Sequence, residues 1–178
     1  MLARMSAARL FAALGLAATA AACAPTMGPP PPRPTGPITF DARQFAWSQA
    51  SGPNSIAGRL GYRQGATAFS CAGSTVVLTP ETPWSRQRMA VLYGSTERAA
   101  LPSDEVRART DRAPPGDAGP YVKRATCDEA GRFTFTGLPD GAWYAITVAR
   151  PAGQPDAEST ALMRRVVTRG GRTVSLVL

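Results

Sequence analysis

Hydrophobic and polar residues alternate along several short stretches of the chain from about Asn54 onward. In RFTFTG at 132–137, Phe133 and Phe135 share one face and polar residues occupy the other. This period of two is typical of a β-strand with one buried face. The same kind of pattern predicts strands at 55–62, 74–80, 121–127, 132–137, 142–150, 161–169 and 172–178. Glycine and proline separate these stretches, so we predict an all-β domain, a seven-stranded β-sandwich with one short helix.

The predicted helix is SRQRMAVLYG at 85–94. Ser85 is the expected N-cap and Gly94 the expected stop, because serine favours helix starts and glycine favours helix ends. The next segment, 95–120, holds four prolines and mixed charges. We expect it to be a long exposed loop, and loops of this length are often functional.

Three turns connect the later strands. In CDEAGRF, Asp128 is expected to accept backbone N–H groups while Gly131 supplies a positive φ. The PDG turn at 139–141 predicts that the strands on either side of it are antiparallel neighbours, and the GG pair at 170–171 predicts a hairpin between the last two strands. The carboxylates of Asp128 and Asp140 are also candidates for calcium binding or acid–base chemistry, although turn formation accounts for both.

The chain begins with an export signal rather than with part of the fold. Residues 1–22 carry two arginines and no acid, and the uncharged run of 13 residues from Leu10 to Ala22 is shorter than the roughly 20 that a membrane-spanning helix needs. The small residues before Cys23 resemble a bacterial lipoprotein signal. That resemblance implies that Cys23 becomes the new N-terminus and carries acyl chains such as palmitate. Ala24 follows the cysteine in place of aspartate, which favours lipid anchoring in the outer membrane; ordinary cleavage is the alternative.

A proline-rich segment follows the predicted lipid anchor. Seven of the 14 residues from Ala24 to Pro37 are proline, a composition that favours an extended polyproline conformation. At about 3.1 Å per residue it would hold the domain roughly 40 Å from the membrane. We therefore divide the chain into a signal peptide at 1–22, a lipidated cysteine and linker at 23–37, and a β-sandwich domain at 38–178.

Charge and composition exclude several function classes. The chain has no histidine, which removes imidazole-based catalysis and most zinc sites. Without its signal it has 18 basic and 12 acidic residues, a net charge of +6. The arginines are scattered without a stripe that tracks phosphates, so we expect no nucleic-acid partner. A diffuse attraction to anionic lipid or polysaccharide needs no specific site and stays open.

Two cysteines, Cys71 and Cys127, remain after Cys23 is assigned to lipid. Disulfides persist in exported proteins, so we predict that these two cysteines are bonded to each other. A reactive or metal-binding thiol pair is the alternative, but the absence of histidine argues against it. We expect neither a metal nor a cofactor.

The segments SIAGRLGY, CAGSTVVLTPETPW and TCDEAGRFTFTGLPDGAWY follow one another in that order. Together they resemble the carboxypeptidase regulatory-like domain, over about residues 54 to 150. The resemblance implies a transthyretin-like seven-stranded sandwich that serves as an accessory module without catalytic activity. The segment between the second and third strands is longer than the family's minimal pattern.

These observations favour a lipid-anchored, non-enzymatic protein of the cell envelope that acts as a structural or binding scaffold. The second hypothesis is a module that binds a glycan or peptidoglycan, because saccharides stack on exposed aromatic rings. Its candidate ligand surface is Trp84, Tyr93, Arg86 and Arg88; Trp47, Trp143 and Tyr121 are further aromatic candidates. Tryptophan in a small sandwich is more often part of the core. An enzyme is the third hypothesis, and two observations disfavour it. The transthyretin-like hydrolases use histidine, which this chain lacks. A glycosidase would need two acids that face a cleft, and the acids of this chain lie mainly in the predicted loop.

Overall fold

The computed structural model describes residues 38–178. Residues Thr35–Leu178 form one compact unit. That unit contains two hydrophobic cores, and its size is sufficient for a domain to fold alone. The signal peptide, the lipidation of Cys23 and the proline-rich linker lie outside the described residues and stay predictions.

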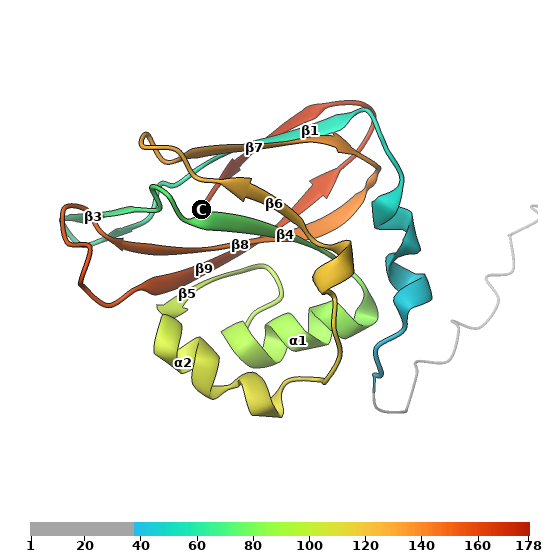
Figure 1. The fold of residues 1–178 in the computed structure, drawn as a ribbon, viewed down its shortest axis with the longest axis horizontal. Helices are drawn as coiled ribbons and strands as arrows, with labels where there is room; N and C mark the ends of the chain where they lie inside the picture. The colour runs from blue at the N-terminus through green and yellow to red at the C-terminus, as the bar shows by residue number, and fades with distance from the viewer. Residues whose placement is uncertain (1–37) are drawn as a thin grey trace, which may run out of the picture. The chain divides into compact units, whose positions relative to one another are not determined.

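Two β-sheets face each other in this unit (Figure 1). The smaller sheet has the order β10-β1-β7 and consists of β1 (Asn54–Arg59), β7 (Arg132–Leu138) and β10 (Thr173–Val177). β1 runs antiparallel to β7 and parallel to β10. The predicted all-β sandwich is therefore confirmed at the level of two packed sheets.

The larger sheet is antiparallel and is organised around its longest strand, β8 (Gly141–Pro151). β9 (Thr160–Thr168) pairs with one edge of β8, and β4 (Thr75–Pro80) and β3 (Thr67–Ser70) pair with the other. Three outer strands complete the sheet: β5 (Arg98–Pro102) on β9, β6 (Lys123–Thr126) on β4, and β2 (Arg63–Gln64) on β3.

The first core lies between the sheets and follows from the alternation in the sequence. Phe133 and Phe135 of β7 are 3% and 5% exposed, while the polar residues between them face solvent. Trp143, Ala145 and Ala149 of β8 meet them from the larger sheet. Burial of these side chains is the main favourable term for sheet packing.

The second core lies on the other face of the larger sheet, which the helices cover (Figure 1). These are α1 (Pro83–Tyr93) and α2 (Ser103–Ala108), and short 3-10 helices occur at η1 (Ala42–Gln49), η2 (Thr110–Arg112) and η3 (Gly119–Tyr121). Met89 and Leu92 of α1 pack on Tyr144 and Met163 of the sheet. The molecule therefore has a helical layer that the sandwich prediction did not include.

The boundaries of the helical region differ from the prediction. α1 begins at Pro83 and its N-cap is Thr82, whose hydroxyl accepts the Ser85 N–H in a capping box. The expected cap, Ser85, is the third helical residue, and its hydroxyl accepts a hydrogen bond from the Thr82 N–H. Gly94 ends the helix at φ 67°, as predicted. The segment 95–120 was wrongly predicted as a loop, because it contains β5, α2, η2 and η3.

Two predicted strand pairings are also wrong. β9 and β10 do not form a hairpin: β9 lies in the larger sheet and β10 pairs with β1 in the smaller one. Likewise β7 and β8 lie in opposite sheets. Asp140 joins the two connections: its Oδ1 accepts hydrogen bonds from the Asn54 side chain at 2.8 Å and from the Gly170 N–H at 3.1 Å.

Candidate functional site

The two aromatic residues of the predicted ligand surface are buried. Trp84 is 2% exposed and Tyr93 is 8% exposed. The Trp84 ring packs on Phe40 and Phe45, and its indole N–H donates to the Pro115 carbonyl at 2.9 Å. Tyr93 packs in the second core and Trp84 packs on the segment before β1, so neither side chain forms part of an exposed platform.

The two arginines of that predicted surface make contacts within the protein. Arg86 pairs with Glu81 at 2.7 Å. Arg88 donates to the Pro114 carbonyl at 2.7 Å and lies over the Trp84 ring at 5.5 Å from its centre. The cation therefore shields one face of the indole ring rather than offering it to a ligand. The four residues do not combine into one exposed site.

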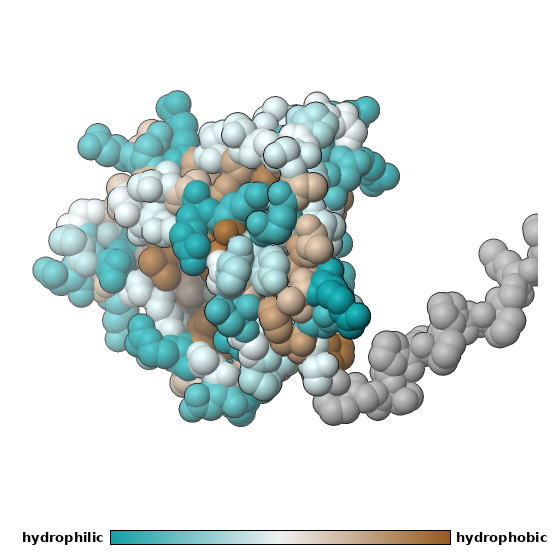
Figure 2. All heavy atoms as spheres, turned by 45° about the vertical axis from the view of Figure 1, so that its right-hand side comes forward, coloured by the Kyte–Doolittle hydropathy of each residue, from teal (hydrophilic) through white to brown (hydrophobic). Residues whose placement is uncertain are grey.

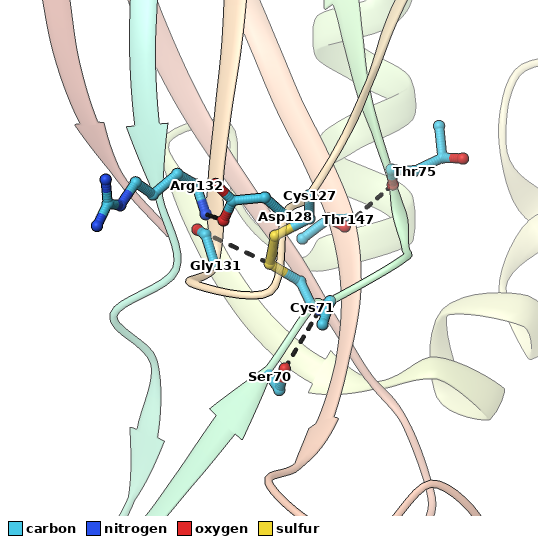
Figure 3. The surroundings of a disulfide bond; sticks show 9 residues. Ser70, Cys71, Thr75, Cys127, Asp128, Gly131, Arg132 and Thr147 are labelled. Atoms are coloured by element: carbon cyan, nitrogen blue, oxygen red, sulfur yellow. Dashed lines mark hydrogen bonds between the residues drawn. A yellow bond between two sulfur atoms is a disulfide. The ribbon is translucent and has the colours of Figure 1, made fainter.

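The predicted disulfide between Cys71 and Cys127 is present and buried (Figure 3). It joins the residue after β3 to the residue after β6, with the two Cα atoms 5.8 Å apart. Asp128, next to the bond, accepts the Arg132 N–H at 2.7 Å, and Gly131 has φ 74°. The predicted turn is therefore confirmed, and the bond fixes it to the larger sheet.

Neither aspartate considered for calcium or acid–base chemistry has a free coordinating environment. Asp128 serves its own turn, and Asp140 joins two inter-sheet connections. Within residues 38–178 there is no cluster of three or more histidine, cysteine, aspartate or glutamate residues that could hold a metal ion. The turn interpretation holds for Asp128, whereas Asp140 bonds to Asn54 and Gly170 outside its own turn.

A groove lies where the smaller sheet ends and the larger sheet continues; we call it the edge groove. Its volume is about 570 Å³. Its lining residues are Gly61, Tyr62, Arg63, Arg98, Ala99, Ala100, Leu162, Met163, Arg164, Val177 and Leu178. β5 and β9 therefore supply one side, and the end of β10 with the segment after β1 supplies the other.

The period-two geometry of β9 explains the composition of the edge groove. Leu162 points between the sheets, and Arg164 lies on the same face of the strand two residues later. The smaller sheet no longer covers β9 at Arg164. The Arg164 guanidinium therefore reaches the edge of the smaller sheet and donates to the Val177 carbonyl at 2.7 Å. On β5, Arg98 is the register partner of Arg164 and is exposed.

The edge groove carries three arginines and no acidic side chain. Arg63, Arg98 and Arg164 line it, and none of them has a carboxylate partner within the described part of the chain. Arg63 donates to the Ala66 carbonyl at 2.7 Å, which leaves its charge uncompensated. Like charges that line a concave surface add their fields, so this groove attracts anions.

Apolar surface lies beside these charges. The apolar floor of the edge groove is lined by Ala100, Val177 and Leu178, which are exposed or half-buried. Leu162 also lines it but is only 3% exposed, and Met163 belongs to the second core on the opposite face of β9. Tyr62 is partly exposed, and its ring meets Phe69 edge to face with the centres 4.9 Å apart. The arrangement can hold a ligand between a ring, an aliphatic floor and several cationic donors, which is the chemistry of a binding site.

Sequence reasoning did not find this groove. The pairing of Arg98 with Arg164 depends on β5, which was assigned to a loop, and the position of Tyr62 depends on where the smaller sheet ends. The sequence RAALP at 98–102 does not alternate between hydrophobic and polar residues, so its strand became visible only through the alternating exposure in the structure.

The sequence matches no family profile and no characterised protein closely enough to place the chain in a family. The fold is similar to a solved structure from Pseudomonas aeruginosa, a "putative carbohydrate binding protein", with a TM-score of 0.52 and 24% sequence identity. The similarity covers 78% of this chain and 97% of that one. No helix within residues 38–178 is long and apolar enough to cross a membrane.

Proposed function

We propose that this protein is a non-catalytic binding module of the cell envelope, held at the outer membrane by lipid on Cys23, and that it binds a saccharide in the edge groove. The observation that carries the proposal is the groove itself, in which Tyr62 and an aliphatic floor lie beside arginine donors. Sugars present both apolar ring faces and hydroxyl groups, and this pairing of surfaces suits both. The volume of about 570 Å³ is that of a typical ligand site.

The structural comparison agrees with this proposal. The similar protein from Pseudomonas aeruginosa is named as a "putative carbohydrate binding protein". At 24% identity the likeness concerns the fold, so the residues of the groove carry the argument for binding. The transthyretin-like topology implied by the turn sequences around Asp128 and Gly141 is part of the same proposal, since such domains serve as accessory modules.

The experiment that tests the proposal uses the Thr35–Leu178 segment on an immobilised panel of bacterial envelope glycans and peptidoglycan fragments. We expect at least one saccharide to be retained, and we expect Tyr62→Ala to reduce its retention about tenfold, which corresponds to the loss of one aromatic contact. Trp84 is not a suitable test residue because its ring belongs to the core.

Two results would contradict saccharide binding. One is retention of no saccharide by the unmodified segment, and the other is equal retention by Tyr62→Ala. Recovery of a single stoichiometric envelope protein after crosslinking in membranes, without saccharide, would instead support the scaffold function. Membrane fractionation of a Cys23→Ser variant tests the anchor separately, because the unlipidated protein is expected in the soluble fraction.

A further inference from the structure

We infer that the ligand of the edge groove is an acidic saccharide that carries carboxylate groups; this inference rests on the proposed saccharide binding. The reason is the arrangement of three arginines around an apolar floor. Arg98 and Arg164 are directly opposite each other on neighbouring antiparallel strands. Side chains at such positions start about 5 Å apart at Cβ, and like charges there repel each other.

Most arginines in the described residues have no carboxylate partner, since only Arg43, Arg86, Arg109 and Arg165 form ion pairs. Arg98 and Arg164 are set apart by their position, because they oppose each other in a groove that Tyr62 also lines. In the edge groove the repulsion between Arg98 and Arg164 is left uncompensated. A bound anion would remove that repulsion, so the site gains more from a charged ligand than from a neutral one.

The shape and floor of the groove select the kind of anion. A small inorganic anion would reach the guanidinium groups but would leave the half-buried Tyr62, Val177 and Leu178 facing water. A sugar ring covers this apolar surface while a carboxylate on the ring accepts paired hydrogen bonds from a planar guanidinium. A chain of uronate residues supplies both features at once.

A second pair of opposed arginines allows the groove to be separated from general surface charge. Arg59 and Arg132 are also register partners, on the outer face of the smaller sheet. The hollow beside them is about 320 Å³ and has no aromatic lining residue. Arg98→Gln and Arg132→Gln therefore each remove one positive charge from a pair of opposed arginines. Only Arg98 lies in a groove that also holds the Tyr62 ring and an apolar floor.

The experiment is calorimetric titration of the Thr35–Leu178 segment with an oligogalacturonide, and in parallel with its fully methyl-esterified form, near physiological ionic strength. The two sugars share a backbone and differ in charge. We expect the acid to bind at least about tenfold more tightly than the ester. We expect Arg98→Gln to weaken binding of the acid about tenfold, and Arg132→Gln to change that binding less than about twofold. Arg98 makes no hydrogen bond or ion pair through its side chain within the described residues, so its variant is expected to fold, which thermal unfolding checks.

Each alternative outcome has a distinct meaning. Equal binding of acid and ester would overturn the acidic specificity and leave saccharide binding intact. Equal effects of Arg98→Gln and Arg132→Gln would overturn the groove as the site and indicate diffuse charge attraction. Binding of neither sugar, while the glycan panel retains another saccharide, would overturn the carboxylate inference alone. An empty panel as well would overturn the proposed function.

Discussion

Removal of the Cys71–Cys127 disulfide should cost about 4 kcal/mol of stability. The bond closes a loop with a sequence separation of 56 residues. In the chain-entropy model a loop of this length lowers the entropy of the unfolded chain by about 14 cal/mol/K, which is about 4 kcal/mol at 25 °C. A domain of this size has a total unfolding free energy of about 5–15 kcal/mol, so the loss is a large share.

The assay is urea unfolding of the Thr35–Leu178 segment and of two variants, Cys71→Ala and the double variant with Cys127→Ala. Because either substitution opens the loop, we expect the single variant to lose most of the 4 kcal/mol and the second substitution to add only its packing cost. The slope of unfolding free energy against urea should also rise, since the open chain exposes more surface when it unfolds.

One result would refute the reasoning. If the single variant lost less than about 1 kcal/mol while the double variant lost much more, the stabilisation would come from packing of the buried sulfur atoms and not from loop closure. Reduction of the unmodified segment with a thiol gives a control without any change of sequence, because it should reproduce the loss seen in the single variant.

Four further predictions concern the stability of the domain. A Cβ on Gly58 would overlap the Phe133 ring, so Gly58→Ala should lower thermal stability by about 2 kcal/mol. Thr82→Ala removes the capping hydroxyl of α1 and should cost about 1 kcal/mol in urea unfolding. Burial raises the pKa of Tyr93 and of Tyr144 to about 12, so the folded state holds these protons more tightly than the unfolded chain does. The unfolding free energy should therefore be constant below pH 10 and fall as the pH rises from 10 towards 12. Tyr144→Phe should reduce that fall. It should also raise the unfolding free energy at neutral pH by about 1 kcal/mol, because the Tyr144 hydroxyl is buried without a hydrogen-bond partner in the structure. A lower unfolding free energy of this variant would contradict the prediction.

The sequence predicted seven of the ten strands of the described residues, because their pattern is local, and it missed β2, β3 and β5. Phe133 and Phe135 alternate with polar residues, and the structure buries them as expected. The pairing of the strands was not local. A GG pair serves equally well in a hairpin and in a connection between sheets. The contacts seen at this connection, such as those of the Asp140 carboxylate with Asn54 and Gly170, join residues distant in the chain.

The candidate site was less accessible from the sequence. Trp84 and Tyr93 were chosen by residue type, yet their spacing on α1 places them on its inner face. The arginines of the edge groove belong to strands far apart in sequence, and only the register of β5 on β9 brings Arg98 to Arg164. A functional site that depends on strand register needs the fold before it can be seen.

The most direct test of saccharide binding in the edge groove is a crystal structure of the Thr35–Leu178 segment with an oligogalacturonide. We predict a sugar ring over Tyr62 and Leu162 with its carboxylate bonded to Arg98 and Arg164. Hydrophilic residues cover much of the face seen in Figure 2, with smaller apolar areas between them, so other positions on the surface are open to a sugar. A ligand bound at such a position, with the groove empty, would contradict the account.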